Sequence, residues 1–125
     1  MPSILIVMLG GAIGAGFRYH VSLVALRNMG PGFPWGTWIV NLLGGFLMGL
    51  LAGTLVRDPQ GGEPLRLFLG VGVLGGFTTF SAFSLETYNM LARGEATMAM
   101  AYAISSVCGA ILLIGAGLWL MRVGG

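Results

Sequence analysis

The sequence predicts an all-α integral membrane protein with four transmembrane helices, the third of which is broken near its middle. Hydrophobic residues make up 56% of the 125 residues and charged residues only 8%, whereas a soluble domain carries about 25% charged residues. Four apolar stretches reach the length of about 20 residues that a bilayer-spanning helix needs. The third stretch is interrupted by paired glycines and a group of hydroxyl side chains.

The predicted spans follow one another with short connections. The first covers residues 3–26 and the second residues 35–56, while the third covers residues 65–92 and the fourth residues 96–121. Proline and glycine in the first two connections are typical of turns. No positive residue precedes the first span, which favours a retained helix over a signal peptide. Residues 1–125 are therefore expected to form a single transmembrane domain.

Glycines recur at four-residue spacing inside the first two spans. Gly45, Gly49 and Gly53 follow this spacing in the second span, and Gly10 and Gly14 follow it in the first. Small residues at this spacing let helix backbones approach closely in a membrane. The pattern therefore predicts tight helix–helix contacts.

The third span is expected to bend or unwind at residues 75–79. In lipid, a backbone polar group freed by a broken helix costs several kcal/mol unless protein, ion or water satisfies it. We therefore interpret this stretch as a broken helix that lines a pathway. Thr78, Thr79 and Ser81 add hydroxyl groups there, and the freed carbonyl oxygens suit a hard cation.

Aromatic and amide side chains near the break could contact an anion. Phe80 and Phe83 share a helix face at their spacing, and their ring edges carry partial positive charge. Such edges could stabilise an anion without the full charge that would trap it. Asn41, in the second span, offers amide donors. The alternative roles are packing for the phenylalanines and an interhelical hydrogen bond for Asn41.

Other polar residues lie within the spans, where ionisable groups are costly and usually face a cavity or water. Arg18 could form an anion-attracting vestibule or could extend toward the membrane surface. Glu86, near the end of the third span, could lie at a pathway mouth or reach out to water. Tyr102 and Ser106 lie one turn apart on one face of the fourth span.

Charge and composition exclude several functions. The chain contains six arginines, no lysine and four acids, too few and too scattered for a nucleic-acid surface. One histidine and one cysteine, Cys108, offer no catalytic triad and no cysteine metal site. We therefore expect no enzyme activity.

The arginines show almost no bias between the two sides of the membrane. Arg57, Arg66 and Arg122 lie on the side of the termini, and Arg27 and Arg93 lie on the other, which Arg18 could join. Because this bias sets the orientation of a membrane protein, near balance permits both orientations. It therefore permits an antiparallel homodimer, and closed two-fold dimers are the commonest assembly.

Three blocks of glycine, aromatic and polar residues follow one another along the chain. The first reads GGAIGA at residues 10–15 and is followed by Arg18 and Tyr19. The second is Trp35-Gly36-Thr37 with Val40, Asn41 and Gly44, and the third is GGFTTFS at residues 75–81 with Phe83. In this order the three blocks resemble the signature of the Fluc/CrcB fluoride channels.

The resemblance implies a fluoride-selective channel for passive export across the cell (inner) membrane. It implies a multi-pass, dual-topology antiparallel homodimer in the lipid bilayer, with two pores and no nucleic-acid partner. The implied pore residues are Asn41, Phe80, Phe83, Thr37, Thr79, Ser81, Tyr102 and Ser106. It further implies Arg18 at a vestibule and Glu86 at a pore mouth. The carbonyls of Gly75 and Thr78 would bind a central structural sodium ion.

The sequence departs from the family pattern in one place and leaves two alternative functions. The family commonly reads Thr-Phe-Ser-Thr-Phe in the third block, where this chain has Ala82 instead of the second threonine. Ala110, one turn beyond Ser106, also lacks a hydroxyl, so the polar track along the pathway is expected to be short.

One alternative function is that of a small dual-topology proton-coupled multidrug exporter, although the first two spans lack the carboxylate that it needs. The other is a non-transporting membrane assembly subunit.

Overall fold

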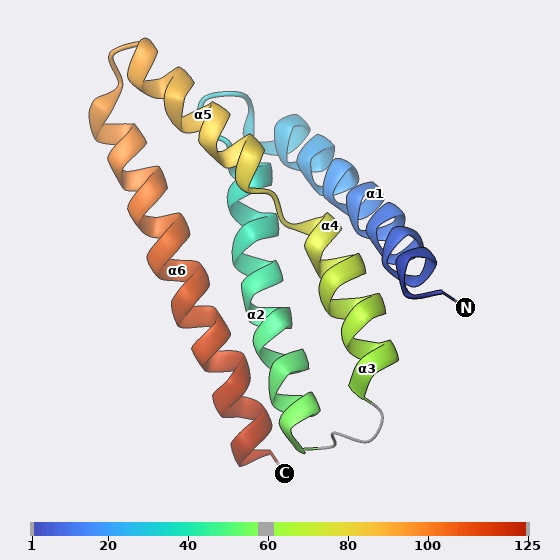
Figure 1. Cartoon of the computed structure of the whole chain (residues 1–125). Coiled ribbons are helices and arrows are strands. Elements are labelled where there is room, and N and C mark those ends of the chain that lie inside the picture. The colour runs from blue at the N-terminus through green and yellow to red at the C-terminus, as the bar shows by residue number, and fades with distance from the viewer. Residues whose placement is uncertain (1, 58–61, 125) are drawn as a thin grey trace.

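The computed structural model describes residues 2–57 and 62–124, which are almost entirely helical (Figure 1). The elements are α1 Ser3–Met29, α2 Trp35–Arg57, α3 Gly62–Leu65, the π-helical segment η2 Arg66–Leu74, α4 Gly75–Phe77, α5 Phe80–Ala92 and α6 Ala96–Val123. Four stretches are long and apolar enough to cross a membrane, namely Ser3–Met29, Trp35–Arg57, Gly62–Ala92 and Ala96–Val123. Four helical stretches of the predicted length and apolar composition are therefore present, and their ends differ slightly from the predicted ones.

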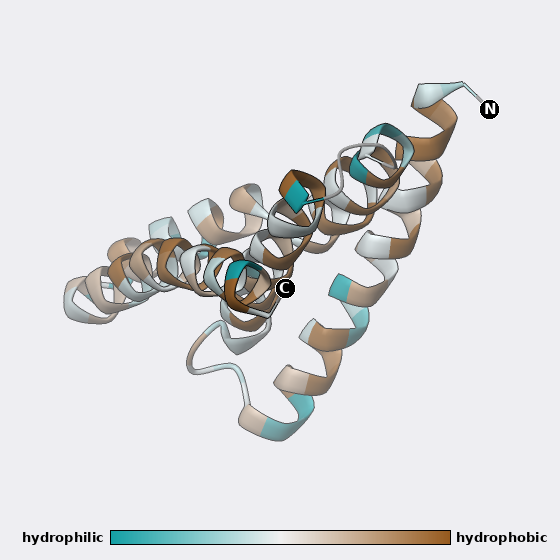
Figure 2. Ribbon diagram, turned by 90° about the horizontal axis from the view of Figure 1, so that it is seen from below, coloured by the Kyte–Doolittle hydropathy of each residue, from teal (hydrophilic) through white to brown (hydrophobic). Residues whose placement is uncertain are grey.

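The spans expose most of their apolar surface. In the most apolar 18-residue stretch of each helix, only 11% of the residues are buried within the chain for α1 and for α6, compared with 33% for α2. Figure 2 shows hydrophobic residues on all sides of the long helices. A helix that is apolar all round needs lipid or protein around it. The outer faces of α1 and α6 are therefore suited to a bilayer or to another protein chain.

The break in the third span moves the chain from one neighbour to another. Before the break, η2 and α4 pack against α1. After it, α5 turns away and packs against α6, on the other side of α2 (Figure 1). The third span therefore crosses over α2 at the point where its helix is interrupted.

Glycines bring the backbones of α2 and α6 into contact. A Cβ atom added to Gly45 would lie 2.9 Å from the carbonyl oxygen of Ala110, and one added to Gly117 would lie 2.6 Å from that of Phe46. Gly49 faces the carbonyl of Ile114 in the same way. The predicted glycine pattern in the second span is confirmed as a packing surface.

A second glycine contact joins α1 to the third span and corrects the expected position of the break. A Cβ atom on Gly76 would lie 2.5 Å from the carbonyl oxygen of Gly11. Gly75 and Gly76 remain helical, and only Thr78 (φ −88°, ψ 160°) and Thr79 (φ −151°, ψ 120°) are extended. The expected break at residues 75–79 is thus narrower, because Gly76 serves close packing against α1.

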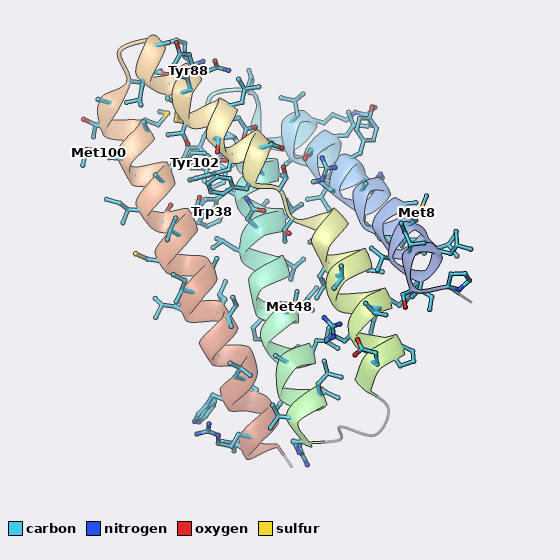
Figure 3. The ribbon with its side chains drawn as sticks, in the orientation of Figure 1. Met8, Trp38, Met48, Tyr88, Met100 and Tyr102 are labelled. Carbon is cyan, nitrogen blue, oxygen red and sulfur yellow. The ribbon has the colours of Figure 1, made fainter. Side chains whose placement is uncertain are left out.

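A cluster of buried side chains lies between α5 and the first half of α6. Met90, Ala99 and Tyr102 are almost completely buried and form a cluster with Trp38 and Phe83 around it. Figure 3 shows Trp38 and Tyr102 in the space between α6 and α2. This cluster holds α5 against the first half of α6 and so fixes the direction of the chain after the break.

Substituting Gly49 with alanine should destabilise the protein. The new methyl group would collide with the carbonyl oxygen of Ile114, and backbone cannot move aside as a flexible side chain can. Overpacking of this kind costs about 1–3 kcal/mol, measurable as a lower thermal unfolding midpoint in detergent. Gly115→Ala is the matched control, since nothing lies within 4 Å of the added Cβ. Equal midpoints for the two variants would contradict the close α2–α6 packing.

Candidate functional site

One side chain, Asn41 of α2, holds the broken backbone of the third span. Its Oδ1 accepts a hydrogen bond from the N–H of Thr79 at 2.8 Å, and its Nδ2 donates to the carbonyl of Thr79 at 3.0 Å. The amide therefore pairs with both backbone polar groups of one extended residue. This satisfies groups that would otherwise be unpaired within a membrane span. Asn41 thus makes the interhelical hydrogen bond that was one of its two predicted roles.

The break leaves the backbone carbonyls of Gly75 and Thr78 without partners among the described residues. In a continuous helix, Gly75 would accept from the N–H of Thr79, and Thr78 would accept from that of Ala82. Here the N–H of Thr79 donates to Asn41 instead, and the N–H of Ala82 donates to Oγ1 of Thr79 at 3.1 Å. Neither carbonyl accepts a hydrogen bond from the described residues. Unpaired carbonyl oxygens are ligands that a hard cation such as sodium can use, so these residues fit the predicted site.

Arg18 is directed toward the break. Its Nε donates to the carbonyl of Gly76 at 3.0 Å, and its side chain is half-buried. The carbonyl of Phe77, which the sequence reasoning did not single out, accepts no hydrogen bond from the described residues. Of the carbonyls at the end of α4, that of Gly76 is therefore paired, whereas those of Gly75 and Phe77 are free.

A polar network joins three helices near the break. Oε2 of Glu86 on α5 accepts from the hydroxyl of Thr37 on α2 at 3.1 Å, and its Oε1 accepts from the hydroxyl of Tyr102 on α6 at 2.9 Å. Thr37 and Tyr102 are buried. The carboxylate of Glu86 is therefore turned into the protein and held by two hydroxyl donors.

The phenylalanines predicted for the pathway differ in their surroundings. Their ring centroids lie 5.8 Å apart, so Phe80 and Phe83 are neighbours on α5. Phe83 is half-buried against the ring of Tyr102, at 5.1 Å between centroids. Phe80 is 77% exposed, so most of its ring faces outward from this chain.

A cavity of about 350 Å³ adjoins the break, and we call it the break cavity. Its polar and aromatic lining comes from Asn41, Thr78, Thr79, Phe80, Phe83 and Ser106. The hydroxyl of Ser106 is buried and has no hydrogen-bond partner within the described chain. The remaining lining is apolar and includes Met48 and Ala110, and no ionised side chain of the described residues contributes. Ser106 is thus the last polar group along that wall of α6, as the alanine at 110 predicts.

A second cavity of about 320 Å³ lies at the connection between α1 and α2, and we call it the loop cavity. Thr37 and Glu86 contribute to its lining, together with Phe33, Asn89 and Arg93. Glu86 also contacts Tyr102, whose ring packs on Phe83 of the break cavity. A chain of direct contacts therefore connects the two cavities.

The residues predicted for the site are only partly brought together. Asn41, Thr79, Phe80, Phe83 and Ser106 line the break cavity. Thr37 lines the loop cavity, and Tyr102 lines neither cavity but connects them through its contacts with Glu86 and Phe83. Ser81 is exposed, and its hydroxyl lies 3.3 Å from that of Thr79. Arg18 contacts the α4 side of the break and lines neither cavity.

The sequence reasoning missed the network around Glu86. The hydrogen bonds connect residues 49 and 16 positions apart in the chain. The available signal was that Thr37, Glu86 and Tyr102 are each polar within an apolar span, but spacing alone does not pair them.

Comparisons with known proteins agree with this architecture. Residues 5–118 match the family model described as CrcB-like protein, Camphor Resistance (CrcB). A curated relative from Sphingopyxis alaskensis, named fluoride-specific ion channel FluC, is 52% identical over 122 residues, covering 98% of this chain and 97% of the relative. Relatives of the same name come from Phenylobacterium zucineum, with 54% identity over 123 residues, and Mesorhizobium japonicum, with 48% over 122 residues. The alignments cover 98% of this chain in both cases, and 97% and 98% of the respective relatives.

These relatives are named as ion channels and not as enzymes, as the sequence predicted. Together with the four helices that are long and apolar enough to span a membrane, they identify the chain as a multi-pass membrane protein. The family match covers most of the chain. The chain therefore belongs to the CrcB-like family, which includes these fluoride-specific ion channels.

Proposed function

We propose that this protein is a fluoride channel that lets fluoride leave the cell passively across the inner membrane. The break cavity is the observation that carries the proposal. Among the described residues, it combines the amide of Asn41, the rings of Phe80 and Phe83 and the unpaired hydroxyl of Ser106, without any ionised side chain. The fluoride-specific names of relatives that are about half identical support the same function.

The chemistry of the break cavity suits an anion that must bind and then leave. The hydroxyl of Ser106 has no partner in the part of the chain that the structure describes, and Asn41 has a second N–H on Nδ2 beyond the one that donates to Thr79. Ring edges add partial positive charge. A conducting site must bind an ion weakly enough to release it, and these groups attract an anion without the full charge of an arginine.

The route continues from the break cavity toward the loop cavity. The hydroxyls of Thr37 and Tyr102 lie on this route, and both donate to Glu86 in this structure. A carboxylate and a fluoride ion compete for the same donors. Glu86 is therefore placed to act at the mouth of the pathway. There the hydroxyls of Thr37 and Tyr102 would donate to the passing fluoride ion and then return to the carboxylate of Glu86.

The functional unit is an antiparallel homodimer with two pores and dual topology. Phe80 lines the break cavity but is 77% exposed, so one chain encloses its own pathway incompletely. Tyr88 and Leu85, also on α5, are 68% and 61% exposed. Because Arg18 points to the break, it adds to neither side, and the numbers of arginines on the two sides of the membrane remain nearly equal. This near equality permits both orientations.

A central sodium ion is proposed at the interface between the two copies. The free carbonyls of Gly75 and Thr78 would hold it, and a second copy would double their number. Gly75 is exposed on a single chain and Thr78 is half-buried, so a partner could reach both. The ion would satisfy backbone groups that the break leaves unpaired and would hold the two copies together.

Fluoride efflux from liposomes tests the function. Vesicles loaded with potassium fluoride and containing the purified protein should release fluoride rapidly when valinomycin carries the potassium charge. Chloride-loaded vesicles should release much less, because chloride is larger and accepts hydrogen bonds more weakly. A fluoride-selective electrode outside the vesicles measures the fluoride rate, and a chloride-selective electrode measures the chloride rate. Fluoride efflux no faster than from protein-free vesicles would reject the proposal.

Asn41→Asp should reduce fluoride efflux and destabilise the break. A carboxylate cannot donate to the carbonyl of Thr79, and leaving a buried partner unsatisfied costs about 1–3 kcal/mol. The new charge would also repel an anion from the break cavity. We expect at least about a tenfold slower efflux, which corresponds to about 1.4 kcal/mol, while size-exclusion chromatography still shows the dimer.

Asn28→Asp is the matched control for that substitution. Asn28 is exposed at the end of α1, where its Nδ2 donates to the carbonyl of Val24. It lines neither cavity, so the same change of amide to carboxylate should leave the efflux rate close to that of the wild type. Wild-type efflux in Asn41→Asp would remove Asn41 from the pathway.

A further inference from the structure

Arg18 fixes a positive charge beside the break in the third span. Its Nε donates to the carbonyl of Gly76 at 3.0 Å, and Gly76 lies in the chain between Gly75 and Thr78, whose carbonyls accept no hydrogen bond from the described residues. The guanidinium group stays charged in proteins, and the hydrogen bond restricts its position. A full positive charge is therefore held at the carbonyl of Gly76, one residue from Gly75 and two residues from Thr78.

No acidic side chain is paired with Arg18 within the described residues. The ion pairs there lie at or beyond the ends of the spans and join Arg66 to Glu63 and Arg93 to Glu95. Glu86 accepts hydrogen bonds from hydroxyl groups on α2 and α6 and lines the loop cavity. The described residues also contain no group of three or more His, Cys, Asp or Glu side chains that could hold a metal ion.

We propose that Arg18 makes the cation site at the break selective for monovalent over divalent ions. The proposal rests on the sodium site proposed above. The repulsion between Arg18 and a bound cation is proportional to the charge of that cation, so a divalent ion is repelled twice as strongly. Calcium sites gain much of their affinity from carboxylates, whereas the oxygens at the break are neutral. A second copy of the chain would add a second Arg18.

Arg18 is thus a positioning and specificity residue that acts through its charge. Arg18→Lys keeps that charge but lacks the Nε donor, so it separates the charge from the hydrogen bond. Arg18→Gln keeps a side-chain donor but removes the charge. If charge sets the ion preference, the lysine variant should retain it and the glutamine variant should lose it.

Thermal unfolding of the purified full chain in detergent measures the preference without any transport assay. Sodium or calcium replaces an organic cation, N-methyl-D-glucamine, at constant ionic strength. An ion that binds only the folded state raises the unfolding midpoint by mass action. Sodium should raise the midpoint of the wild type at a much lower concentration than calcium does. In Arg18→Gln, the ratio of apparent calcium affinity to sodium affinity should rise about tenfold or more, as the Coulomb difference predicts.

Arg27→Gln is the charge-matched control, because Arg27 is exposed in the last turn of α1. It should keep the wild-type ratio. An unchanged ratio in Arg18→Gln, with sodium still stabilising the protein, would overturn the role of Arg18 and leave the sodium site standing. A wild type that sodium does not stabilise would overturn the sodium site and the role of Arg18 with it.

A competition experiment on the wild type decides the matter if Arg18→Gln fails to fold. Sodium NMR detects whether calcium displaces bound sodium from the purified protein. Failure of a large calcium excess to displace sodium supports the proposal. Displacement at equal concentrations of the two ions would overturn it, whatever the variants do.

Discussion

The structure depends on the pairing of one amide, that of Asn41, with the backbone of Thr79. A chain that crosses a bilayer can leave the helical conformation only where its polar groups find partners. Asn41 supplies an acceptor and a donor to the same residue, at 2.8 and 3.0 Å. The third span can therefore stop as a helix after Phe77 and start again at Phe80.

This interruption gives the two halves of the third span different neighbours. The first half packs on α1 through backbone contacts such as that between Gly76 and Gly11, and α5 packs on α6 around Tyr102. The same change of direction opens the break cavity between α2, α5 and α6. The N–H of Thr79 donates to Asn41 and not to the carbonyl of Gly75, which is thereby left available to a cation. One interaction thus shapes both the proposed anion pathway and the proposed cation site.

Features that depend on local composition and spacing could be predicted from the sequence. The four spans follow from hydropathy, and the contacts of Gly45 and Gly49 follow from small residues at four-residue spacing. The precise break could not be predicted, because packing against α1 keeps the glycine pair helical. The partners of Glu86 also depend on which faces of three helices meet, and that information is not contained in the periodicity of any one span.

The central claim is that fluoride enters the cavity that Asn41 helps to form at the break. Solid-state NMR of the protein in bilayers can follow the side-chain amide of Asn41 and the backbone amide of Thr79 while fluoride is added. The account predicts saturable chemical-shift changes at both groups with fluoride, and much smaller changes with chloride at the same concentration. Equal responses to the two anions, or no response to fluoride, would contradict it.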